Sequence, residues 1–118
     1  MDERSQRLVD QLLETTNAGR ITWTTAFEDG QFKTVLPKGE LAFIVQVKGD
    51  TRRFLMLDQE QEVILDETLT DDQVVNEPET SPKLRLYREL GMLQMVARRK
   101  ALQVSDKLDM AEKLLAAI

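Results

Sequence analysis

Residues 31–65, QFKTVLPKGELAFIVQVKGDTRRFLMLDQEQEVIL, decide the fold, because their apolar side chains recur mainly with a period of two. The stretch predicts four strands, at Phe32–Leu36, Leu41–Lys48, Arg52–Asp58 and Glu62–Leu65. Short links with turn residues join them, at Pro37-Lys38-Gly39, Gly49-Asp50 and Asp58 to Gln61. Parallel pairing would need crossovers of about a dozen residues or more, so these links predict an antiparallel meander.

A helix is expected before the meander. Residues 3–18 place apolar side chains at helical spacing, and Gly19 stands where a left-handed residue would end the helix. Residues 21–27 follow, with the only tryptophan, Trp23. They are expected to form a short strand or an extended connection, with Trp23 packed as a lid over the sheet edge or, alternatively, serving as a binding hot spot.

Helices are expected after the meander as well. A polar, acidic connection over residues 68–82 leads to Ser81, a suitable N-cap for a helix over residues 83–102. Ser105 is expected to restart a second helix. The sequence therefore predicts one α+β domain over residues 1–118, with an N-terminal helix, a four-stranded antiparallel meander and two C-terminal helices packed on the sheet.

Composition and charge narrow the function classes. The 118 residues suit a single domain, and the absence of cysteine excludes disulfides and thiolate metal sites. No apolar leader segment is visible at the start, and we expect a cytoplasmic protein. The net charge of −5 disfavours nucleic acid and anionic membranes as partners. Residues 54–82 carry nine acids and no base, whereas residues 83–118 carry eight bases against four acids, so the two segments could also pair within the fold.

Two stretches carry a family resemblance. The first runs from Leu12-Leu13-Glu14 through Gly19 to Trp23, and the second is Ala97-Arg98-Arg99-Lys100-Ala101-Leu102 with the apolar residues that follow it. Together they resemble small, uncharacterised bacterial α+β domains with an N-terminal helix, a β-meander and a C-terminal ARRxAL-type helix. The resemblance implies a bacterial source and brings no function with it.

Catalytic machinery is not evident in the sequence. There is no histidine, so the usual general base and the commonest metal ligand are missing, and no glycine-rich phosphate loop occurs. Asp58, Glu60 and Glu62 imitate the start of a calcium loop, but Val63 and Leu69 occupy positions that need glycine and glutamate. We therefore expect no metal, no cofactor and no catalytic residues, and an enzyme that uses carboxylates alone is a remote alternative.

The helix over residues 83–102 has more apolar surface than one sheet face requires. Its main stripe is Leu86, Leu90, Leu93, Ala97, Ala101 and Val104. A second stripe, with arginines at its border, gives the candidate partner-binding residues Leu84, Arg88, Met92, Met95, Arg99 and Leu102. Methionine and arginine are favoured at protein interfaces, although another helix of the same chain could equally cover this stripe. The strands are apolar in both phases too, so either helices cover both sheet faces or one face meets a partner.

These observations support two main hypotheses. The first is a non-catalytic protein-interaction module that binds another protein or itself as a homodimer. The second is an acidic neutralising protein, of the antitoxin or immunity type, which would present an acidic patch to a basic partner. That patch would comprise Asp58, Glu60, Glu62, Asp66, Glu67, Asp71 and Asp72.

Overall fold

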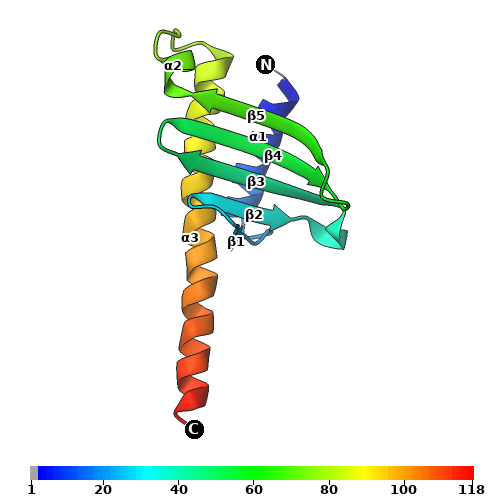
Figure 1. Cartoon of the computed structure of the whole chain (residues 1–118), viewed down its shortest axis with the longest axis vertical. Coiled ribbons are helices and arrows are strands. Elements are labelled where there is room, and N and C mark those ends of the chain that lie inside the picture. The colour runs from blue at the N-terminus through cyan, green and yellow to red at the C-terminus, as the bar shows by residue number, and fades with distance from the viewer. Residues whose placement is uncertain (1–2) are drawn as a thin grey trace.

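The computed structural model describes residues 3–118, apart from the side chains of Val104 and Ser105. In this part of the chain the elements are α1 (Glu3–Asn17), β1 (Thr24–Thr25), β2 (Gln31–Val35), a 3₁₀ turn (Pro37–Gly39), β3 (Leu41–Lys48), β4 (Thr51–Asp58), β5 (Val63–Thr70), α2 (Asp71–Val74) and α3 (Pro82–Ala116). The α+β class and the order of helix, meander and helix are confirmed (Figure 1).

The strands pair antiparallel in chain order, from β1 to β5, within residues 3–118. The sheet has five strands rather than the predicted four, because part of the extended stretch over residues 21–27 pairs with β2 as β1. The last strand is also longer than predicted and runs on to Thr70. Polar residues can continue it because β5 is an edge strand and most of its side chains are exposed to solvent or half-buried.

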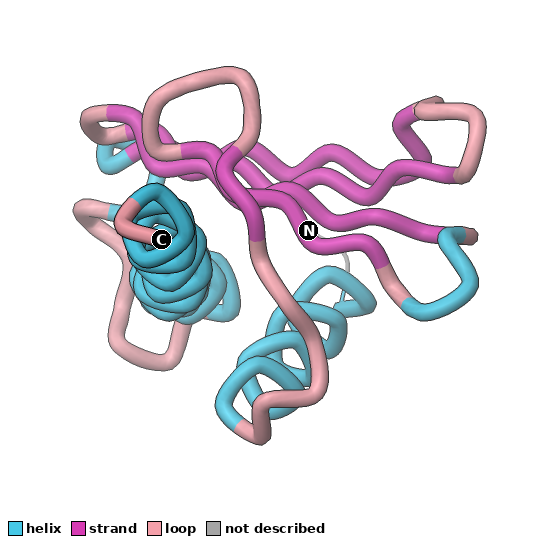
Figure 2. The backbone as a smooth tube through the Cα atoms, turned by 90° about the horizontal axis from the view of Figure 1, so that it is seen from below, coloured by secondary structure: helices cyan, strands magenta, loops and turns pink. Residues whose placement is uncertain are grey.

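Both long helices lie on the same face of the sheet, as Figure 2 shows from below. Between them and the sheet lie the largest fully buried side chains, among them Trp23, Phe54, Leu86, Leu90 and Leu93. The indole Nε1–H of Trp23 donates to Thr16 Oγ1 at 3.0 Å, so the expected lid has a polar partner. The opposite sheet face is covered by no helix in the described chain (Figure 2), so of the two alternatives for the doubly apolar strands, the one with helices on both faces does not hold.

The local signals at the ends of the helices work as predicted. Gly19 adopts a φ of 72°, and the backbone N–H groups of Gly19 and Arg20 bond back to the last turn of α1. At the start of α3, the Ser81 hydroxyl accepts from the Leu84 N–H at 3.3 Å, and Pro82 occupies the first helical position. These caps fix where each helix meets the sheet.

The C-terminal region differs from the prediction of two helices. Over residues 82–116 the structure has one continuous helix, α3, of 35 residues. Ser105 does not start a new helix, because no glycine or proline interrupts residues 92–118 and a serine inside a helix costs only a few tenths of a kcal/mol. One end of α3 packs under the sheet and the other extends well beyond it, which gives the molecule a long dimension of 59 Å (Figure 1).

Candidate interaction surface

The main stripe of α3 forms the contact with the sheet. Leu86, Leu90, Leu93, Ala97 and Ala101 are all buried, as predicted, whereas the side chain of Val104 lies outside the described residues. Ala101 is the last buried residue of the described chain, and every described side chain after it is exposed. The covered part of α3 therefore ends at Ala101.

The second stripe faces away from the sheet. Leu84 is half-buried against the core, but Met92, Met95 and Leu102 are 51%, 54% and 44% exposed. The alternative in which another helix covers this stripe therefore fails for these three residues, whereas Leu84 packs in part on the core. We call Met92, Met95 and Leu102 the outer stripe. That it binds a partner stays a prediction.

Arginines border the outer stripe as expected, and one of them, Arg88, is held by an acid of the same chain. Arg88 donates to both carboxylate oxygens of Glu79, at 2.7 and 3.1 Å, and this guanidinium lowers the pKa of Glu79. Glu77 also lies 3.9 Å from Lys83. The acidic connection thus pairs with the start of α3, in line with the expectation that the two charged segments could balance within the fold. Arg99 is exposed.

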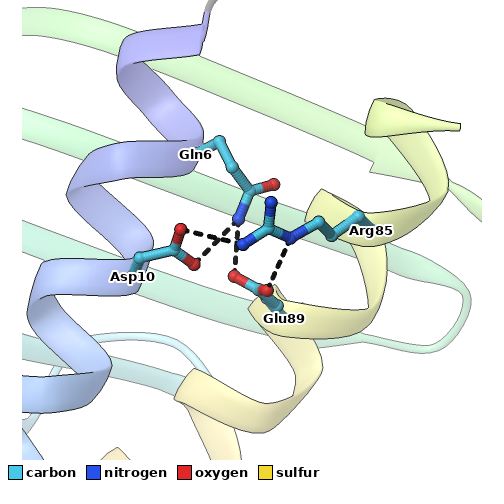
Figure 3. Close-up of polar contacts among 4 residues, drawn as sticks. All are labelled: Gln6, Asp10, Arg85 and Glu89. Atoms are coloured by element: carbon cyan, nitrogen blue, oxygen red, sulfur yellow. Dashed lines mark hydrogen bonds and ion pairs between the residues drawn. The ribbon is translucent and has the colours of Figure 1, made fainter. Parts of the chain in front are cut away.

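A third arginine of α3, Arg85, joins the two long helices (Figure 3). Arg85 donates to Asp10 of α1 at 3.1 Å and to Glu89 at 3.0 Å. Gln6 donates to Asp10 and Glu89 as well, at 3.0 and 2.5 Å. Burial and the neighbouring Asp10 carboxylate raise the pKa of Glu89. This cluster fixes α1 against the covered half of α3, so the uncovered half extends from an anchored base.

That uncovered half of α3, together with the two residues that follow the helix, makes up residues 102–118 and is here called the stalk. Its large apolar side chains are exposed, with Leu108 at 61%, Leu115 at 71% and Met110, Leu114 and Ile118 comparable or higher. The sequence prediction placed this region on a separate second helix packed on the sheet. The signal that was missed is the unbroken helical spacing from Leu86 to Ile118, which no turn residue interrupts after Gly91.

The predicted acidic residues do not form one patch. Asp58, Glu60 and Glu62 gather at the β4–β5 turn, with carboxylate oxygens within 4.8 Å of one another, and Asp71 and Asp72 lie at the other end of β5. Eight residues of strand put about 25 Å between these ends. Between them, Asp66 pairs with Arg53 at 2.9 Å, and Glu67 accepts from Ser5 of α1 at 2.9 Å.

The turn cluster has a structural explanation. Asp58 Oδ1 accepts the backbone N–H groups of Glu60 and Glu62, both at 2.9 Å, which closes the turn between β4 and β5. A hollow beside α1 is lined mainly by apolar side chains, among them Leu8, Leu12 and Phe43, and Glu14 is the one acid on its wall in the described chain. Neither place combines a sheltered pocket with a pair of free carboxylates.

Comparison of the chain with protein families, curated proteins and solved structures finds no match. The resemblance to small bacterial domains therefore stays a prediction. No helix among the described residues is both long enough and apolar enough to cross a membrane. Because the comparisons give no family, the function is argued from the exposed apolar surface of α3.

Proposed function

We propose that the protein is a non-catalytic interaction module and that α3 carries its binding surface. The observation behind the proposal is the exposure of large apolar side chains along one helix, from Met92 in the outer stripe to Leu115 in the last turn of α3. Exposed apolar patches of this kind mark sites of protein–protein contact in folded proteins. A helix held at one end is also a rigid support, so little conformational freedom is lost when a partner binds.

The contacts of the charged residues favour this function over the acidic neutralising protein. Glu67 and Asp66 already have partners within the chain, and the remaining acids of the predicted patch lie at separate ends of β5. Charge steering of a basic partner works best when like charges are focused on one surface. We therefore propose apolar contact through α3 as the main source of binding.

Capture of a partner from a bacterial lysate tests the proposal, with the wild-type chain and three variants as baits. Met95→Asp places a charge in the outer stripe, Leu115→Asp places one in the stalk, and Gln103→Asp is the matched control at an exposed polar position. A partner, or a second differently tagged copy, should be retained by the wild type and by Gln103→Asp and lost with one of the other two. Retention by all four baits, or by none, contradicts binding through α3.

A further inference from the structure

One face of α3 changes from buried to exposed without any change in its sequence pattern. The buried positions Leu86, Leu90, Leu93, Ala97 and Ala101 are spaced by three or four residues, and the same face continues through position 104 to Leu108, Ala111, Leu115 and Ile118. The sheet covers the first set, and the second set is exposed where it is described. We call the second set the stalk face.

We propose that the stalk face is covered by a second copy of this chain, whose stalk lies antiparallel to the first across a two-fold axis. This inference rests on the proposed function and names the partner. Facing apolar positions spaced by three and four residues are the pattern by which two helices pack along a common seam. A two-fold axis lets the same surface serve both copies.

The size of the side chains suits this arrangement. With the axis between positions 109 and 110, Leu108 faces Ala111 of the second copy and Leu115 faces position 104, while Ile118, just after the end of α3, lies level with Ala101. Each long side chain thus meets a smaller one, valine at position 104 and alanine at the other two. Such alternation of large and small residues fills the space between two helices without voids. The stalk face is therefore complementary in shape to the same face of an antiparallel second copy.

The position of the sheet excludes the parallel alternative. The stalk face lies on the side of α3 that packs on the sheet further up, so a parallel partner helix would run into the sheet of the first copy. Figure 1 shows that the space beside the stalk is free of the chain's own elements. An antiparallel partner fits there, and its own sheet would lie beyond the tip of the first stalk.

Charge favours the same direction. A parallel pair would bring the basic runs Arg98-Arg99-Lys100 of the two copies side by side. In the antiparallel register, Arg99 of one copy lies about 30 Å along the axis from Arg99 of the other, because 21 helical residues of about 1.5 Å separate their levels. That separation exceeds the Debye length of about 8 Å at physiological salt, so the repulsion is screened.

Engineered cysteines test the direction and the register together, because the chain has no cysteine of its own. In the proposed dimer, position 115 faces position 104 of the second copy, whereas the two copies of position 115 are about 16 Å apart along the axis. Leu115→Cys and Val104→Cys are prepared separately, and one of them is tagged. Oxidised glutathione is then added to each variant alone and to a mixture of the two variants. A disulfide requires Cα atoms within about 7 Å.

The expected result is a cross-linked heterodimer in the mixture and no cross-link in either variant alone. Cross-linking of each variant by itself would show a parallel pair and overturn the proposal. Absence of cross-links in all three samples would also overturn it, because the facing positions would not be in contact.

Light scattering on the full chain gives an independent readout. The wild type should have about twice the monomer mass of 13.6 kDa, Leu115→Asp should have the monomer mass, and the control Gln103→Asp should remain dimeric. The emission of the single, buried Trp23 reports in each variant whether the sheet and α1 are still folded. A monomeric wild type overturns this inference. The proposed function is then tested separately, by whether Met95→Asp or Leu115→Asp loses a partner protein other than a second copy of the chain.

Discussion

The same substitution at two places on one face of α3 should destabilise the protein strongly at one place and only slightly at the other. Leu90 is fully buried under the sheet, and Leu115 is 71% exposed on the stalk. Leu90→Ala removes a core side chain and leaves a cavity, which costs about 3 kcal/mol of unfolding free energy. Leu115→Ala removes a side chain of which only about a third is shielded, so it loses at most about 0.7 kcal/mol of burial, and the higher helix propensity of alanine offsets part of that loss.

Urea unfolding followed by Trp23 emission measures both variants. With a urea m-value of about 1.5 kcal/mol per M, Leu90→Ala should lower the midpoint by about 2 M, and Leu115→Ala should change it by less than about 0.5 M in dilute protein. In concentrated protein the wild-type midpoint should rise, because a dimer stabilises the folded chain by mass action, and Leu115→Ala should reduce that rise. An equal loss for both variants in dilute protein would refute the reasoning, since Leu115 would then be part of the monomer core.

Three further predictions concern the fold that supports α3. Gly30→Ala should lower the unfolding free energy by at least about 2 kcal/mol, because Gly30 has a φ of 73° and an added Cβ would collide with a backbone carbonyl of β3; urea unfolding measures the loss. Thr16→Val should cost about 1–3 kcal/mol in the same assay, because it leaves the buried N–H of Trp23 without its acceptor. Asp66→Asn should cost less than about 1 kcal/mol at pH 7, because the pair with Arg53 is solvent-exposed. Since Arg53 lowers the pKa of Asp66, this stabilisation is complete above the ordinary pKa of 3.8 and is lost as the pH falls through the lowered value; unfolding curves of both proteins should therefore converge in acid.

The elements with strong local signals could be predicted from the sequence, and the long-range geometry could not. The meander follows from the alternation over residues 31–65 and from its short turns, and the ends of α1 and α3 follow from Gly19 and Ser81. Ser105 was misleading because serine is common both at helix starts and inside helices, so one residue could not decide whether α3 continues. Helix periodicity shows which face is apolar, but it does not show how far the sheet reaches along that face.

The same limit applies to the candidate surface. The sequence identified the outer stripe of Met92, Met95 and Leu102 as surplus to one core, and these side chains are exposed in the structure. It could not identify the stalk, because the apolar residues from Leu108 onward have the same spacing as those of a helix packed on the sheet. The cover ends at Ala101 because α3 crosses the sheet from β5 to β1 and runs on past this last strand of the described residues (Figure 1).

The stalk can present its apolar face because the body of the protein has already formed the start of the helix. An isolated helix of the length of residues 102–118 is marginally stable in water, since fixing the first turn is unfavourable. In this chain that first turn lies far upstream, at Ser81 and Pro82, and the clamp of Arg85 on Asp10 and Glu89 holds it. Each residue of the stalk then adds only a propagation step, and the stretch contains no glycine or proline and many good helix formers. The apolar side chains of the stalk are therefore held at helical spacing before any partner arrives, which lowers the ordering cost of binding and makes a helix of matching length a suitable partner.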